Sequence, residues 1–125
     1  MPDMKLAAIF GFLAVLLGAF GAHALKDWLA SLPDGADRLG WWKTGVEYQM
    51  FHALLLVGIA ASGKPMRAAT VLVAVGILLF SGSLYAMTLS GIRLLGAITP
   101  FGGLAFLGAW AMVFVAARGT STAQT

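Results

Sequence analysis

Four long apolar stretches separated by short polar breaks constrain this chain more than any other feature. The stretches cover residues 6–25, 44–61, 68–89 and 94–117. A helix of about 20 residues, rising about 1.5 Å per residue, crosses the roughly 30 Å hydrocarbon core of a bilayer. The pattern therefore predicts an all-α fold, a four-helix transmembrane antiparallel bundle that forms one domain over residues 1–118. Residues 119–125 are predicted to be a disordered tail.

The composition excludes most classes of soluble protein. Charged residues make up 10% of the chain, against about 25% in a typical soluble domain. The eight basic residues lie in the breaks between apolar stretches and form no cluster, so we expect no nucleic-acid binding and take the lipid bilayer as the main partner. The absence of cysteine excludes disulfides, thiolate metal ligands and a cysteine nucleophile.

The first apolar stretch has a second interpretation. Lys5, the run over residues 6–20 and the Ala22-His23-Ala24 triplet resemble a signal peptide with its cleavage site, and cleavage would leave three helices. The run is longer than the usual signal-peptide core of about 7–15 residues. It also carries small residues at packing spacings, so we favour a first membrane span.

Small residues recur at helical spacing in this stretch. Ala14, Gly18 and Ala22 step by four residues, and in lipid such residues let helix backbones approach closely. We interpret them as contacts within the bundle, with an oligomer interface as the alternative. The short breaks near residues 62–65 and 90–93 make neighbouring helices antiparallel. The only substantial predicted loop covers residues 26–43, and its Trp28, Trp41 and Trp42 are expected in an interfacial aromatic belt.

Polar residues of the apolar stretches gather in the membrane half that adjoins residues 26–43, here called the loop face; the opposite side is the terminal face. Unpaired polar groups cost several kcal/mol in hydrocarbon, so these side chains should point inward and bond one another. The sequence predicts an intramembrane polar cluster in one leaflet, drawn from all four helices. Its candidate members are His23, Tyr48, Gln49, His52, Ser81, Ser83, Tyr85 and Thr99.

Two histidines decide how this polar cluster is interpreted. We expect His23 and His52 to face the interior within about one side chain of each other, which makes them weak candidates for zinc ligands. Glu47 is five residues from His52 and does not share its helix face; it is expected among the headgroups or paired with Lys43. We favour a hydrogen-bonded plug that fixes helix register, without metal or cofactor. A proton relay, a metal site and a small-ligand pocket are the alternatives.

Thr99-Pro100 interrupts the last apolar stretch. Proline at the first helical position after a threonine N-cap is a favoured helix start. This predicts a helix over residues 100–117 preceded by an interfacial segment over residues 94–98. One continuous kinked helix is the alternative.

Several motifs carry a family resemblance. They are Gly18 to Leu25, Thr44-Gly45, Tyr48-Gln49-Met50, His52-Ala53-Leu54, Ser81 to Tyr85, Gly96, Thr99-Pro100, Gly102-Gly103, Gly108 and Trp110. In this order the chain resembles the uncharacterised YgdD-like family of small bacterial inner-membrane proteins, a domain of unknown function related to eukaryotic transmembrane protein 256. The resemblance implies a four-helix bundle in the bacterial inner (plasma) membrane, and it implies no activity, cofactor or catalytic residue.

No nucleophile is paired with a base in this sequence, so we predict no catalytic residue and no enzymatic activity. The favoured function is a structural or interaction protein that assembles with other membrane proteins or with itself. The alternative is a small transporter or ligand-binding membrane protein that uses His23 and His52. A channel must connect both water phases, whereas the polar residues end near mid-membrane, so we predict a plug and no continuous channel. The basic residues are divided four to four between the two faces and give no orientation.

Overall fold

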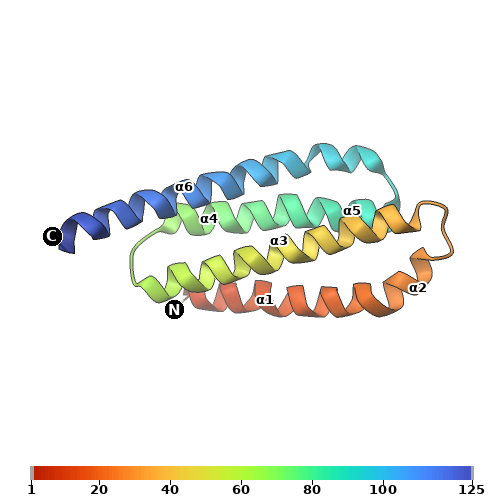
Figure 1. Ribbon diagram of the computed structural model, residues 1–125, viewed down its shortest axis with the longest axis horizontal. Coiled ribbons are helices and arrows are strands. Elements are labelled where there is room, and N and C mark those ends of the chain that lie inside the picture. Colours follow the sequence, from red (N-terminus) through yellow and green to blue (C-terminus); the bar gives the residue numbers. More distant parts are fainter. Residues whose placement is uncertain (1, 125) are drawn as a thin grey trace.

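A computed structural model of the chain describes residues 2–124, and the side chains of residues 3–118. The helices follow one another as four rods. The first is α1 (Pro2–Phe20), η1 (Gly21–Leu25) and α2 (Lys26–Leu29); the second is α3 (Gly35–Ser62); the third is α4 (Arg67–Gly76), η2 (Ile77–Ser81) and α5 (Gly82–Ser90); the fourth is η3 (Arg93–Ala97) and α6 (Thr99–Gln124). The rods run antiparallel, with the start of α1 and the end of α6 at the same end (Figure 1). The predicted all-α four-helix fold is confirmed.

The predicted disordered tail, residues 119–125, lies outside the part of the chain whose side chains are described.

Two of the rods end where the sequence predicts a break. Gly63 follows α3 with a φ of 71°, and Gly91 follows α5 with a φ of 73°. This left-handed conformation closes a helix C-terminus and is accessible to glycine without strain.

The region predicted as a loop is mostly helical. α2 prolongs the first rod to Leu29, α3 begins at Gly35, and only residues 30–34 connect them. The second helix therefore begins nine residues earlier than expected. Charged and aromatic residues over 35–43 lower the hydropathy but do not oppose helix formation, so the helix extends beyond its apolar part. Gly35 permits the tight turn, because a Cβ there would overlap the Leu29 carbonyl.

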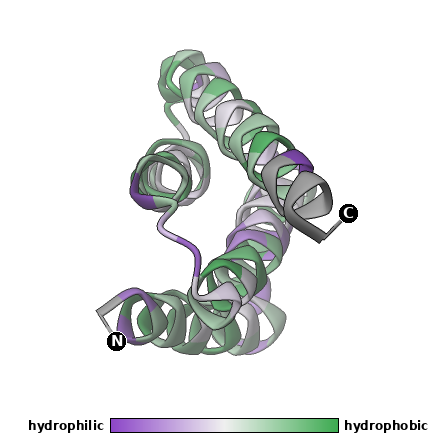
Figure 2. Ribbon diagram, turned by 90° about the vertical axis from the view of Figure 1, so that its left-hand side faces the viewer, coloured by the Kyte–Doolittle hydropathy of each residue, from purple (hydrophilic) through white to green (hydrophobic). Residues whose placement is uncertain are grey.

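Each rod packs on its neighbours in chain order. α1 packs on α3, α3 packs on η2 and α5, and α6 packs on α4 and η2. The end-on view shows that hydrophobic residues predominate along the rods (Figure 2). Among them Phe12, Leu78 and Leu107 are 70%, 65% and 67% exposed. Large exposed apolar surfaces of this kind are typical of helices that face lipid.

Three rods are long and apolar enough to cross a membrane: Asp3–Leu29, Arg67–Ser90 and Arg93–Arg118. α3 is as long but is not among them. Glu47, Gln49 and His52 lower its mean hydropathy. These polar residues lie on the rod that packs between the first and the third.

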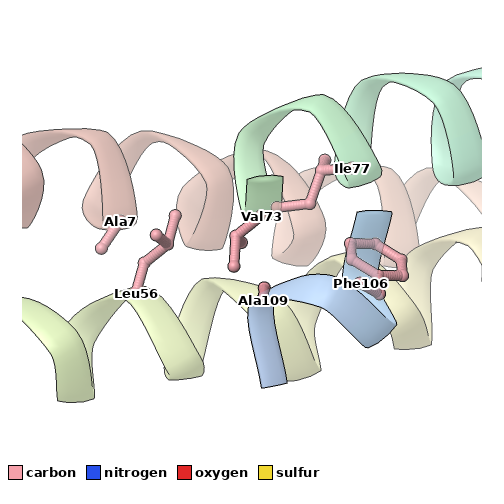
Figure 3. Packing of buried hydrophobic residues seen from close by; sticks show 6 residues of the cluster. All are labelled: Ala7, Leu56, Val73, Ile77, Phe106 and Ala109. Carbon is pink, nitrogen blue, oxygen red and sulfur yellow. The ribbon is translucent and has the colours of Figure 1, made fainter. Parts of the chain in front are cut away.

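The terminal half of the bundle has an apolar core with residues from all four rods (Figure 3). Its buried members are Ala7, Leu56, Val73, Ile77, Phe106 and Ala109. Close approach depends on glycine: a Cβ on Gly76 would overlap the Phe106 ring. This end is therefore closed by tight apolar packing.

The predicted break at Thr99-Pro100 is present. η3 is a 3₁₀ turn, and α6 begins at Thr99 with Pro100 as its second residue. At that position the missing N–H of proline breaks no helical hydrogen bond. The Thr99 hydroxyl lies 2.6 Å from that of Ser83, which ties α6 to α5.

Candidate functional site

The interior polar residues form separate groups instead of the single predicted cluster. The first is centred on Gln49, which is 2% exposed. Its Nε2 donates a hydrogen bond of 2.9 Å to the Phe10 carbonyl, and its Oε1 accepts one of 2.7 Å from the Tyr85 hydroxyl. Ser81 donates to the Gly45 carbonyl at 2.6 Å. One glutamine thus links α1 to α5 through α3.

Gly45 makes room for this group. A Cβ at this position would lie 2.8 Å from Cε1 of Tyr85, closer than van der Waals contact permits. The Tyr85 ring packs on the Trp42 ring, with 4.6 Å between their centroids. The glycine therefore lets an aromatic side chain lie directly on the α3 backbone.

His52 forms a second group one turn further along α3, where its side chain meets α6. Its ring stacks on Phe106, with centroids 3.6 Å apart and planes inclined by 11°. Nδ1 lies 2.7 Å from the Tyr48 carbonyl, and Nε2 lies 3.2 Å from the Trp110 indole nitrogen. A carbonyl only accepts and an indole N–H only donates, so Nδ1 carries the hydrogen and Nε2 is the acceptor. The imidazole is neutral, and both its nitrogens are occupied.

A third group lies at the loop face around Arg38, which is 8% exposed. Its Nε donates to the Thr88 carbonyl at 2.7 Å, and Nη2 donates to the Leu89 carbonyl at 3.1 Å. Nη1 lies 3.5 Å from the Asp34 carboxylate. A guanidinium at the last carbonyls of α5 meets the negative end of the helix dipole. Sequence reasoning left Arg38 in a loop, and no spacing in the sequence identifies its partners.

Trp42 also lies elsewhere than predicted. It was expected in the aromatic belt, but it is 3% exposed and its indole donates to the Leu17 carbonyl at 2.8 Å. That carbonyl comes four residues before Gly21, where the π turn η1 interrupts the α-helical pattern. A Cβ on Gly21 would lie 2.5 Å from the indole Cδ1, so this glycine admits the ring.

His23 is exposed on η1, and the expectation that it faces the interior near His52 is wrong. Gly11 is level with Ala53, because a Cβ on Gly11 would lie 3.9 Å from the Cβ of Ala53. His23 comes twelve residues after Gly11, which places it about 18 Å away along the helix axis. Since α3 extends back to Gly35, His23 is level with its first turns.

The other candidates are distributed as follows. Tyr48 is 39% exposed, and its ring packs on Phe80 with centroids 4.6 Å apart. Ser83 bonds both the Thr99 hydroxyl and the Phe80 carbonyl. The three polar groups extend from Arg38 to His52, about 21 Å along α3. Among the residues whose side chains are described, no three His, Cys, Asp or Glu side chains are placed to hold a metal ion.

Comparison with known proteins gives consistent matches. Residues 17–103 match the family described as protein of unknown function (DUF423). The chain is 45% identical over 116 residues to the UPF0382 inner membrane protein YgdD of Escherichia coli (strain K12), covering 89% of this chain and 85% of that protein. It is 47% identical over 118 residues to the UPF0382 membrane protein YwdK of Bacillus subtilis (strain 168), covering 90% and 92%. No solved structure matches it.

Proposed function

Since the chain belongs to the DUF423 family of proteins of unknown function, which confirms the resemblance to YgdD-like proteins, we propose a function from its own geometry. It is a multi-pass protein of the bacterial inner membrane that binds other membrane proteins through its lipid-facing surface. It is neither an enzyme nor a transporter. The polar groups of its interior hold the helices in register.

The saturation of the interior polar groups is the observation that carries this proposal. Gln49, His52 and Arg38 each bond two or more partners within the chain. Among the described side chains, Thr70 Oγ1 is the one buried nitrogen or oxygen without a hydrogen-bond partner. Substrate binding or proton transfer would need available donors and acceptors, and the side chains of each group bond backbone carbonyls and neighbouring side chains instead.

The apolar core of the terminal half supports the same proposal. Leu56 and Val73 are fully buried and lie between His52 and the terminal face. An ion or polar solute that passed the His52 group would meet aliphatic and aromatic side chains, with the single hydroxyl of Thr70 among the buried polar side chains described there. Conduction needs a polar or hydrated path between both water phases, which favours a plug over a transporter.

We also propose that α3 is a fourth membrane span. Its connections to the first and third rods lie at opposite ends of the bundle (Figure 1). α3 packs along α1 and along η2 and α5, so it crosses the same thickness as they do. Its polar Gln49 and His52 are covered by neighbouring rods, which removes the objection to placing these two side chains in hydrocarbon, whereas Glu47 is exposed.

Site-specific photo-cross-linking in native membranes tests the proposal. A photoreactive phenylalanine analogue at Phe12, Leu78 or Leu107 places a probe on the outer face of three different rods. We expect discrete adducts with particular membrane proteins from some of these positions and none from the others. Equal, diffuse labelling from all three would contradict a specific interaction surface.

Transport is tested separately with purified protein in liposomes that contain a pH-sensitive dye. We expect the same proton leak as in empty liposomes. A higher leak that disappears in His52→Ala would overturn the proposal in favour of the transporter.

A further inference from the structure

The outer surface is hollowed between α1 and α3. A cavity of about 490 Å³ is lined by Gly11, Phe12, Val15, Leu16, Ala19 and Met50. A second of about 190 Å³ includes Gly18, Ala22, Lys43 and Glu47 in its lining. Gly11, Val15, Gly18 and Ala22 follow one another at three- and four-residue steps, so the two cavities lie along one face of α1. Together they form a groove, here called the α1–α3 groove.

The groove holds a carboxylate between the charged residues of the two faces. Glu47 is exposed and lies nine residues beyond Arg38, about 14 Å along α3. On the terminal side, a Cβ on Gly11 would lie 3.9 Å from the Cβ of Ala53, so these two residues are level. Lys5 lies six residues before Gly11, which places it about 18 Å past Glu47. The register of α1 and α3 therefore places Glu47 between the two charged layers.

Glu47 has no counter-ion within the described part of the chain. Lys43 is one helical turn away and is also exposed, but the ion pairs there are Arg38 with Asp34 and Arg93 with Asp37. The expected Lys43–Glu47 pair does not form. An intramembrane charge is costly and is normally paired or turned toward a protein interior. A lipid-facing Glu47 beside an unpaired Lys43 therefore requires something else to cover it.

We propose that a second copy of this chain covers the α1–α3 groove, with Glu47 of each copy paired to Lys43 of the other. This inference rests on the proposed function, because it names one partner and one surface of the same interaction protein. Two copies inserted in the same orientation are related by a two-fold axis along the membrane normal. Such an interface is isologous, so one groove carrying both charges is complementary to itself.

The geometry suits that arrangement. Across this axis the two α3 helices run parallel, and Lys43 and Glu47 differ in depth by about 6 Å. A flexible lysine stem bridges that offset, as charged pairs do across parallel coiled coils. Gly11, Gly18 and Ala22 keep the groove floor low, which lets helices approach closely in lipid. The small-residue stripe, interpreted from sequence as packing within the bundle, thus also faces a groove.

Cysteine cross-linking tests the contact, and the natural chain contains no cysteine to confuse it. The purified Met50→Cys variant in liposomes carries its thiol in the groove. The matched Leu107→Cys variant carries it on the outer face of α6, where Leu107 is 67% exposed. With a short bis-maleimide we expect dimers from Met50→Cys that persist on dilution with lipid. Equal yields from both variants, or yields that fall equally on dilution as a lipid-filled groove predicts, would overturn the proposal.

Charge exchange then tests the ion pairs. In the Met50→Cys background, Glu47→Lys or Lys43→Glu alone should weaken dimerisation by about tenfold or more, since each leaves like charges opposed in a low dielectric. The double variant Lys43→Glu/Glu47→Lys should restore the dimer, because the pairs are remade in reverse. Helical circular dichroism of each monomer controls for folding, and the isosteric Glu47→Gln provides a milder variant if Glu47→Lys does not fold.

Failure to restore the dimer would overturn the second copy as occupant. If Phe12 then still labelled particular proteins in native membranes, the proposed function would stand with another partner. Loss of specific labelling as well would overturn both.

Discussion

The two ends of the bundle hold four helices together by different means. The terminal half is held by close side-chain packing: Leu56, Val73 and Phe106 pack together where glycine lets the rods approach. The loop half is held by directional hydrogen bonds, which Arg38 and Trp42 donate to backbone carbonyls of neighbouring rods. In lipid, apolar side chains gain little by moving from acyl chains into protein, so neither end depends mainly on the hydrophobic effect. Shape specifies one end and hydrogen bonding the other.

Removing the guanidinium of Arg38 should have the largest effect. Arg38→Gln loses two charge-assisted bonds to α5 carbonyls and should lower the free energy of unfolding by about 3 kcal/mol. Arg93→Gln is the control, since the side chain of Arg93 is 63% exposed and its ion pair is worth little. Unfolding in mixed detergent micelles, followed by circular dichroism, measures both. Equal effects would show that the loop end is not held by directional bonds.

A methyl group on Gly76 should disturb the terminal half next most strongly. Gly76→Ala places Cβ against the Phe106 ring, and overpacking of this kind costs about 2 kcal/mol. Gly58→Ala, also within a helix, is the matched control, because nothing lies within 4 Å of its added Cβ. The same unfolding measurement compares them. A tolerated Gly76→Ala would mean that close packing is not what holds this end.

A double-mutant cycle on Gln49 and Tyr85 tests a bond near the boundary between the two regions. Gln49→Leu removes both of its interhelical bonds, and Tyr85→Phe removes only the one they share. We expect a coupling energy of about 1 kcal/mol, within the range found for hydrogen bonds between membrane helices. A coupling near zero would indicate that the two side chains are held by packing alone.

Trp110→Phe should have the smallest effect. It keeps the aromatic contact with His52 and removes the indole donor, which should cost about 0.6 kcal/mol. Nitrogen NMR of the His52 ring checks the assignment directly. The natural protein should show the hydrogen on Nδ1 and a bonded, unprotonated Nε2, and only the Nε2 resonance should change markedly in the variant. A hydrogen on Nε2 in the natural protein would contradict the assigned tautomer.

Hydropathy was sufficient to predict the helices and their order, because span length and short connections follow from composition along the chain. The break at Thr99 was predicted from the Thr99-Pro100 pair. It failed over residues 26–43, because a low hydropathy does not distinguish a loop from a helix that leaves the membrane. Partners such as Arg38 with Thr88, or His52 with Trp110, are about 50 residues or more apart and depend on helix rotation. The polar residues were recognisable from the sequence, but their grouping was not.

The π turn η1 makes the length of the first rod adjustable. A turn of this kind holds one residue more than an α-helical turn, and it arises where a residue is inserted without displacing the segments on either side. Removing one residue from Gly21–Leu25 would let the helix close in regular geometry while α1 and α2 stay on their present partners. After such a deletion the Leu17 carbonyl would accept a hydrogen bond within the regular helix. It would then no longer be available to the indole N–H of Trp42. Insertions and deletions among related sequences should therefore be tolerated at this turn more readily than in the α-helical parts of the same rod, with the residue at position 42 changing alongside.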